Sequence, residues 1–283
     1  MTSTLTGTEL EVLPLSSSIG AVVRGVDLKE ADDEAIAAIR KVWLERKVVF
    51  FPGQHLDETE HQAFGARFGE LTEGHPVVPS VEGFPNLFEI DYSKARELYA
   101  HYGDLASRQQ GTGWHTDVTF MPRPPAGSIL RAVVIPPSGG DTVFSNQQAA
   151  FEALSPAFRD FLSTLHAVHD GKAQFSTVLE RVGQGKWEGL ELPDLEPVTH
   201  PVVRTHPETG AQVLFVNPGF TSHILELTPA ELSGNRFQFG EFEGVPFLVE
   251  QYRLSPDRLI VIVRISTIRR YEIEVVRFVE IDA

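Results

Sequence analysis

The chain is 283 residues long, 42% hydrophobic and 10% aromatic, a composition that supports a sizeable packed core. Its formal net charge of −15 argues against nucleic acid as a partner, because affinity for phosphate backbones comes mainly from clustered Lys and Arg. Cysteine is absent, so disulfides and thiolate metal sites are excluded, and a bound metal would have to use His, Asp, Glu or water.

No leader or membrane segment stands out in the sequence. Residues 1–20 have no basic start and no continuous apolar run, and no other stretch approaches the length that spans a bilayer. We therefore expect a cytoplasmic protein with no membrane partner. Pro and Gly are scattered, and no repeat or low-complexity tract interrupts the chain, so one domain over residues 1–283 is the simplest organisation.

The first third of the chain predicts two helices around a buried strand. Aspartates suited to an N-cap open residues 33–46, where apolar residues recur at helical spacing, so this segment predicts an amphipathic helix. The apolar run 48–51 then predicts a buried strand that a Pro-Gly pair ends. A start that resembles a capping box predicts a second helix over residues 57–70.

From residue 87 onward, short β-like segments dominate. Two helices are expected among them, over 147–154 and 156–166, the second with Pro156 at its first position. Many short strands with a few helices predict a mainly β fold with flanking helices, a two-sheet sandwich or jelly roll. The expected strands are 87–92, 114–120, 128–135, 142–145, 198–205, 212–217, 246–254, 258–265 and 271–281, with a hairpin turn at 207–210.

His115 and Asp117 are the strongest candidates for a metal site. On a strand, side chains two residues apart point to the same face, so the imidazole and the carboxylate are expected to project together. Side by side they supply two-thirds of a facial triad, which leaves positions of an Fe(II) open for a bidentate co-substrate and dioxygen. A His-x-Asp tripeptide alone is weak evidence, and it needs supporting context.

The context is a set of longer motifs. The string WHTDVTF at residues 114–120 is similar to the iron-binding strand of the taurine dioxygenase-like (TauD/TfdA) family of Fe(II)- and 2-oxoglutarate-dependent dioxygenases. The resemblance covers roughly residues 10–232, and its motifs are specific in combination. The other motifs are KVVFF at 47–51 with Gly53–Gln54, FGEL at 68–71 before His75–Pro76, GGDT at 139–142 with Phe144 and Asn146, HPVVRTHPETG at 200–210, and LFVN at 214–217 with Gly219–Phe220–Thr221.

The resemblance implies a double-stranded β-helix that binds Fe(II) and 2-oxoglutarate. It implies hydroxylation of a small anionic substrate, a sulfonate, sulfate ester or carboxylate, by dioxygen, with release of succinate and CO2. His115 and Asp117 are then the iron ligands, and Thr142 helps to hold the 2-oxoglutarate carboxylate by donating its hydroxyl proton. His75 matches a substrate-binding histidine.

Two positions of the substrate pocket depart from the family pattern. A polar residue of the family is here Gly111, and an aromatic one is here Gly171, so the pocket is expected to be remodelled and taurine itself is not the expected substrate. Family members often form dimers or tetramers, and we accordingly expect a homo-oligomer.

Two further histidine pairs are interpreted as unrelated to metal binding. His166 and His169 lie three apart near an expected helix end, a spacing that is more often found on a surface than at a metal. His200 and His206 each precede a proline at an expected strand end, and we interpret them as structural.

The last fifty residues depart from the resemblance. The family's third iron ligand is a late histidine, but no histidine follows His223, and the strand pattern puts Arg269 at that position. Arginine keeps its proton and has no lone pair to give to iron. The two family arginines fall on Glu274 and Phe278, with Arg277 one place from the second as the candidate partner of the 2-oxoglutarate carboxylate.

Three hypotheses follow from the sequence. The first is an active Fe(II)- and 2-oxoglutarate-dependent dioxygenase, the hypothesis that the motifs favour. Its third iron ligand would then come from elsewhere in the chain, and His223 is the only late candidate. The second is a catalytically impaired relative that keeps the fold and binds a small anion or a partner, because the C-terminal ligand residues are missing. The third is a hydrolase on a jelly roll, in which zinc at His115 and Asp117 activates water.

Overall fold

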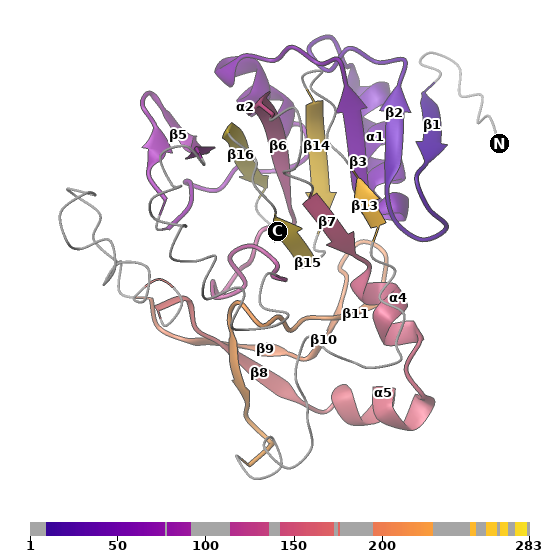
Figure 1. Ribbon diagram of the computed structural model, residues 1–283, viewed down its shortest axis with the longest axis vertical. Helices are drawn as coiled ribbons and strands as arrows, with labels where there is room; N and C mark the ends of the chain where they lie inside the picture. The colour runs from indigo at the N-terminus through magenta and orange to yellow at the C-terminus, as the bar shows by residue number, and fades with distance from the viewer. Residues whose placement is uncertain are drawn as a thin grey trace.

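The fold combines one large sheet, smaller sheets that face it, and helices packed on the outside (Figure 1). The computed structural model describes residues 10–76, 78–91, 114–135, 142–172, 175, 195–228, 250–252, 259–264, 267–270 and 275–281.

The large sheet has eight strands. In chain order they are β1 (Glu11–Pro14), β2 (Ala21–Arg24), β3 (Val48–Pro52), β4 (Ser80–Val81), β5 (Phe84–Asp91), β6 (Gly127–Val134), β14 (Leu259–Arg264) and β16 (Val275–Ile281). Their order in the sheet is β1-β2-β3-β14-β6-β16-β5-β4, and every neighbouring pair is antiparallel except β2 and β3. The late strands β14 and β16 therefore lie inside the sheet, between strands from the first half of the chain.

Helices cover the outer face of this sheet and one end of the molecule (Figure 1). They are α1 (Asp33–Arg46), α2 (Glu58–Ala66), α4 (Gln147–Glu152) and α5 (Pro156–Leu162). In α1, Ile39 and Trp43 are buried and pack in one cluster with Val49 and Phe51 of β3 and with Phe64 of α2. Burial of these large apolar side chains fastens both helices to the sheet.

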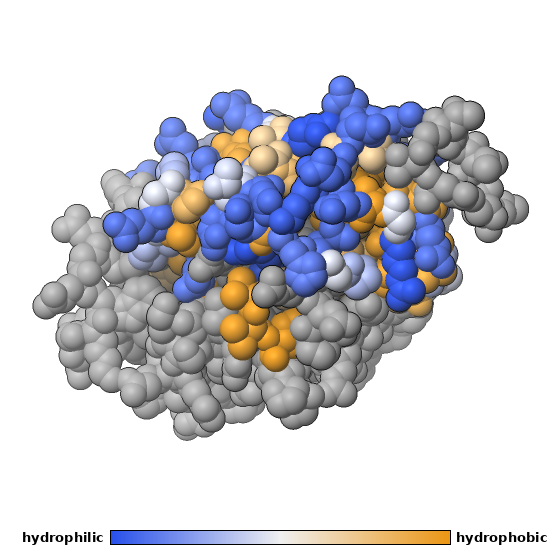
Figure 2. All heavy atoms as spheres, turned by 90° about the horizontal axis from the view of Figure 1, so that it is seen from above, coloured by the Kyte–Doolittle hydropathy of each residue, from blue (hydrophilic) through white to orange (hydrophobic). Residues whose placement is uncertain are grey.

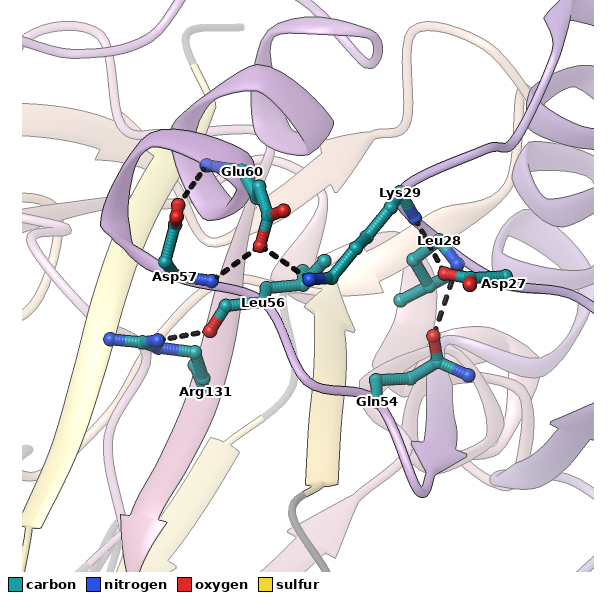
Figure 3. Close-up of polar contacts among 8 residues, drawn as sticks. All are labelled: Asp27, Leu28, Lys29, Gln54, Leu56, Asp57, Glu60 and Arg131. Carbon is teal, nitrogen blue, oxygen red and sulfur yellow. Dashed lines mark hydrogen bonds and ion pairs between the residues drawn. The ribbon is translucent and has the colours of Figure 1, made fainter.

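Polar contacts fix the start of α2 (Figure 3). The Asp57 side chain accepts a hydrogen bond from the Glu60 backbone N at 2.8 Å, and the Glu60 side chain accepts one from the Asp57 N at 2.7 Å. Glu60 also pairs with Lys29 at 2.9 Å. From β6, Arg131 donates to the carbonyl of Leu56. The predicted capping box is therefore present, and it ties the helix to the sheet beneath it.

The inner face of the large sheet packs against a three-stranded sheet of order β13-β7-β15. Its strands are β7 (Thr142–Ser145), β13 (Glu250–Tyr252) and β15 (Thr267–Arg270). Phe50 of β3 and Leu130 of β6 share a buried cluster with Phe144 of β7, and the two phenylalanine ring centroids are 6.1 Å apart. Alternate residues of β3 thus serve the inner and outer faces, as expected for a strand between two packed layers.

A second three-stranded sheet, of order β12-β8-β9, and a hairpin complete the smaller layer. The strands are β8 (His166–His169), β9 (Val198–Pro201), β10 (Val203–Thr205), β11 (Gln212–Leu214) and β12 (Thr221–Ile224). In the β10–β11 hairpin, His206 Nδ1 accepts hydrogen bonds from the backbone N of Glu208 at 3.2 Å and of Thr209 at 3.3 Å. His206 is therefore structural, as the sequence predicted.

The predicted fold class, mainly β with flanking helices in a jelly roll, is confirmed. The helix over 33–46 has the predicted bounds, and its N-cap Asp32 accepts a hydrogen bond from Ala35 N. The helix expected over 156–166 is too long, because α5 ends at Leu162 and residues 166–169 form β8. Hydroxyls of Ser163 and Thr164 donate to the last helical carbonyls, which satisfies the helix end at that point.

The described residues on the face seen from above are mostly hydrophilic (Figure 2). Figure 2, seen from above, shows blue hydrophilic residues over most of the coloured surface, with hydrophobic residues scattered among them. Within the described segments, none of the helices has both the length and the apolar character needed to cross a membrane.

Candidate metal and cofactor site

His115 and Asp117 point toward each other. Nε2 of His115 lies 3.1 Å from Oδ1 of Asp117, and both side chains are about one-quarter exposed, at 24% and 22%. Two ligand atoms about 2.1 Å from a shared metal and at right angles to each other would be about 3.0 Å apart. The two side chains therefore have the separation and the donor atoms needed to bind one metal ion at adjacent coordination positions, and both are partly exposed to solvent.

The segment that carries this pair is not a strand over 114–120, and that prediction is wrong. His115 makes an isolated bridge, and residues 117–120 form a turn in which Met121 N donates to Val118 O at 3.0 Å. Val118 has a φ of 48°, in the left-handed region that is unfavourable for a β-branched residue. The side chains converge because the backbone turns after His115, and strand alternation is not the cause.

A second turn supports His115 from the other side. Phe220 stands edge-on to the His115 ring, with centroids 6.3 Å apart and an interplanar angle of 90°. A Cβ added at Gly219 would lie only 3.1 Å from His115 Cβ and 3.2 Å from Asn217 Oδ1. The absence of a side chain at 219 therefore lets this turn approach the histidine closely.

Below the turn at 117–120 lies a buried polar network. Thr119 and His169 are fully buried and Asn217 is 2% exposed. Asn217 Nδ2 donates to Thr119 Oγ1 at 3.1 Å, and His169 Nδ1 lies 2.9 Å from the same oxygen. Asn217 Oδ1 accepts from Phe220 N at 2.9 Å. The network joins the turn after Asp117, strand β8 and the turn that packs on His115.

His169 is neutral at physiological pH. Its pKa is lowered to about 4, mainly by burial and then by the nearby His200, while the Phe215 carbonyl opposes the shift. The Phe215 ring stacks on His169 at 5.6 Å and stands perpendicular to His200 at 5.3 Å. His200 Nε2 lies 3.1 Å from Met121 O, so the structural role predicted for His200 agrees with its position.

His75 lies at the far end of a row of aromatic rings that leads to the metal pair. Its ring centroid is 5.8 Å from Phe175, which is 6.2 Å from Phe220, which in turn is 6.3 Å from His115. His75 Nδ1 accepts a hydrogen bond from Val78 N at 2.9 Å, which fixes the orientation of the ring. The row therefore connects the candidate substrate residue with the candidate metal ligands through apolar surface.

Thr142 begins β7 and is 3% exposed. Among the residues that the structure describes, none forms a hydrogen bond with its buried Oγ1. A buried hydroxyl without a partner is costly, so this oxygen is suited to a polar ligand. A carboxylate oxygen of 2-oxoglutarate would accept its proton, and Thr142 therefore fits the group that the resemblance implies.

Comparison with known proteins identifies the family. The family model described as taurine catabolism dioxygenase TauD, TfdA family, matches residues 11–243, more than four-fifths of the chain. The chain belongs to this family. The motif-based resemblance over residues 10–232 is thereby confirmed.

The named relatives of this chain differ in the substrates for which they are named. An alpha-ketoglutarate-dependent sulfate ester dioxygenase of Pseudomonas putida is 36% identical over 73% of this chain, which spans 65% of the relative's length. An (S)-phenoxypropionate/alpha-ketoglutarate-dioxygenase of Sphingobium herbicidovorans is 31% identical over 87% of this chain and 83% of its own. A crystal structure of a taurine dioxygenase from Burkholderia xenovorans matches with a TM-score of 0.78 and 33% identity, covering 97% of this chain and 89% of that chain.

The TauD/TfdA match ends before the strands that carry the late arginines. In β15, Arg269 lies opposite Val143 and Arg270 lies opposite Thr142. Directly opposed residues of an antiparallel pair belong to the same face, so Arg270 takes the face of Thr142 and Arg269 takes the other. Within the described segments, no three His, Cys, Asp or Glu residues come together as a metal site.

Arg277, the predicted carboxylate partner, occupies a different layer. In β16 it lies opposite Arg131 of β6 and Glu89 of β5. Arg131 reaches toward the start of α2, on the outer face of the large sheet. The register thus places position 277 on the helix-covered side, whereas Thr142 belongs to the facing sheet.

Sequence reasoning missed the polar network. It interpreted His169 as a surface residue near a helix end, but His169 is fully buried in β8, whereas His166 is exposed and pairs with Glu226 at 2.8 Å. Thr119 and Asn217 stood inside matching motifs as polar residues among apolar ones, and that was the available signal. Their partnership depends on contacts between segments about a hundred residues apart, which local patterns do not encode.

Proposed function

We propose that this chain is an Fe(II)- and 2-oxoglutarate-dependent dioxygenase that hydroxylates a small anionic substrate and forms succinate and CO2. The observation that carries the proposal is the 3.1 Å approach of His115 Nε2 to Asp117 Oδ1 in a chain of the TauD/TfdA family. An imidazole and a carboxylate suit non-haem Fe(II), and two protein ligands leave several coordination positions open.

Thr142 is the proposed donor to the co-substrate, because its buried hydroxyl is suited to a carboxylate oxygen. We propose Arg270 as the cation that binds the same carboxylate, because the β7–β15 register places Arg270 directly opposite Thr142. A guanidinium binds a carboxylate through paired N–H donors. Arg277 remains a prediction from the resemblance that the register does not favour. Bound iron, with 2-oxoglutarate and dioxygen, would supply the oxidation, with dioxygen as the oxidant, while the chain's own residues hold and orient the reactants.

His75 is the proposed partner of the substrate's anionic group. An anion bound there would place its carbon skeleton along Phe175 and Phe220 toward His115. This arrangement favours substrates that join an anionic head to an apolar body. Relatives named for sulfate esters and for phenoxypropionate support that class, and taurine, with a charge at each end, fits it poorly.

The test is turnover measured as succinate. The protein is loaded anaerobically with Fe(II) and 2-oxoglutarate, oxygen is added, and succinate is measured with alkyl sulfates, alkyl sulfonates and phenoxy carboxylates in turn. Succinate is expected to rise with at least one class, and His115→Ala and Asp117→Ala are expected to abolish it. His166→Ala, which removes an exposed histidine of β8, is the matched control and should retain activity.

Two results would replace the proposal. Absence of succinate with every substrate class, together with unaltered ligand binding in His115→Ala, would indicate the non-catalytic relative. Oxygen-independent release of product from a protein that contains zinc would indicate the hydrolase.

A further inference from the structure

We propose that Thr119, His169 and Asn217 are positioning residues that hold His115 and Asp117 at the separation a metal ion requires. The inference rests on the proposed function, because it assumes that those two side chains bind the metal. It assigns a role to a buried network that meets the row of rings at Phe220, whose backbone N donates to Asn217 Oδ1. Three segments meet in this network: the turn after Asp117, the turn that packs on His115, and strand β8.

The first step is the direction of the hydrogen bonds. Asn217 Nδ2 can only donate, so Thr119 Oγ1 accepts that bond, and its own proton is free to donate to His169 Nδ1, 2.9 Å away. In this arrangement His169 offers a lone pair on Nδ1. Its neutral state at physiological pH provides one, because burial lowers its pKa to about 4. The chain of donors therefore runs from Asn217 through Thr119 to His169.

The second step concerns the turn after Asp117. Val118 has a φ of 48°, a conformation that costs about 1–3 kcal/mol and persists only where surrounding contacts impose it. Its side chain is buried with Phe120 and Phe220, and the next residue, Thr119, is held from two sides. Release of Thr119 would let the turn relax toward an ordinary backbone conformation. The carboxylate of Asp117, two residues earlier, would then lose its orientation toward His115.

The third step concerns His115. Asn217 Oδ1 accepts from Phe220 N at 2.9 Å, and Asn217 N donates to Thr221 Oγ1 at 3.0 Å. These bonds shape the turn that brings Gly219 against His115 Cβ and Phe220 against its ring. One asparagine therefore connects the support of His115 with the support of Asp117.

The experiment compares two substitutions of one residue. Thr119→Val keeps the shape and removes the hydroxyl, and Thr119→Ser keeps the hydroxyl. Affinity for Co(II), used in place of Fe(II), is measured on the purified full chain together with the visible spectrum of the bound ion. Thr119→Val is expected to weaken Co(II) binding about 10- to 100-fold, the usual effect of removing a group that orients a metal ligand. Thr119→Ser is expected to restore both affinity and spectrum.

A stability control separates positioning from general loosening. His61→Gln alters another fully buried histidine, which lies 3.2 Å from Ile129 O in the cluster under α1 and α2. It should lower stability and leave Co(II) affinity unchanged. Because Thr119→Val leaves two buried polar groups unpaired, the double variant Thr119→Val/His169→Leu is a second test that replaces two partners with apolar groups. It should fold and still bind Co(II) more weakly than the wild type.

The outcomes are distinct. Wild-type affinity in Thr119→Val, or in the folded double variant, overturns the inference while the proposed function stands. An equal loss of affinity in Thr119→Ser and Thr119→Val also overturns it, because the hydroxyl would then not be the group that matters. A wild-type chain that binds no Co(II) overturns the proposed function, and this inference with it.

Discussion

His115 and Asp117 lie where two turns pack against each other, and the absence of a Cβ at Gly219 affects the geometry there. The turn at 117–120 aims the carboxylate, and the turn that contains Gly219 limits where the imidazole lies. The pairing of the two residues could be predicted from the sequence, because a His-x-Asp spacing inside a long motif is informative. The reason for the pairing could not, since the left-handed Val118 depends on burial and on hydrogen bonds from distant segments.

Gly219→Ala tests the close approach directly. Gly219 lies outside the left-handed region, so alanine suits its backbone, but the new Cβ would sit 3.1 Å from His115 Cβ and 3.2 Å from Asn217 Oδ1. The histidine or the turn must shift by a few tenths of an ångström. We expect Co(II) affinity to fall about tenfold, which corresponds to about 1.4 kcal/mol, while the free energy of unfolding changes by less than about 1 kcal/mol.

Gly210 provides a control, because its substitution should lower stability without changing metal affinity. Gly210 has a φ of 69° in the hairpin turn and open space around it. Gly210→Ala should lower the free energy of unfolding by about 1 kcal/mol because of its left-handed backbone, and leave metal affinity intact. Unchanged Co(II) affinity in Gly219→Ala would show that the approach to His115 does not matter for the site.

At the scale of whole elements, the sequence predicted best what is locally encoded. The helix over 33–46 carries its own cap and its own apolar period, and its bounds are correct. The segment 114–120 has strand-like composition, yet tertiary contacts bend it into a turn. Strands β13, β14 and β16 lie within segments that the sequence predicted as extended, whereas β15 at Thr267–Arg270 falls between two predicted strands and was not anticipated. Which residue faces which partner follows from the register, and a shift by one residue exchanges the two faces.

The register of β15 leads to a prediction about 2-oxoglutarate. Arg270 lies opposite Thr142 and Arg269 lies opposite Val143, so the two arginines belong to different faces. Arg270→Gln is expected to weaken 2-oxoglutarate binding by roughly 10- to 100-fold, since hydrogen bonds to charged groups contribute about 1.5–3 kcal/mol. Arg269→Gln, its neighbour, should leave binding nearly unchanged. Calorimetric titration of the metal-loaded protein measures both, and a larger loss in Arg269→Gln would show that the register assignment does not govern co-substrate binding.

At the scale of the whole molecule, the late strands β14 and β16 have a structural role that does not depend on metal or co-substrate binding. β14 lies between β3 and β6, and β16 lies between β6 and β5, so the sheet depends on them for its continuity. Strands enclosed on both sides favour apolar, β-branched residues. This explains how the tail retains the hydrophobic pattern of strands while the ligand residues of the family are missing from the positions that the motifs assign. Selection for a continuous sheet and selection for a metal ligand act on different residues of the same strands.

The buried histidines link the stability of the molecule to pH. Burial, with a smaller effect of Arg131, lowers the pKa of His61 to about 3, and burial lowers that of His169 to about 4. The unfolded chain binds these protons near the ordinary pKa of about 6.5, so it gains protons first as the pH falls. The folded state is therefore fully favoured above about pH 6.5 and loses stability as the pH falls toward 4.

The size of this effect can be isolated with a single variant. Between pH 7 and pH 5, each such histidine is expected to lower the free energy of unfolding by about 2 kcal/mol. His61→Gln retains an N–H that can donate to Ile129 O but cannot titrate. Urea unfolding at both pH values should therefore show a pH-dependent loss about 2 kcal/mol smaller in His61→Gln than in the wild type. Titration of carboxylates cancels in this comparison, and an identical loss in the two proteins would mean that His61 is not held neutral in the folded state.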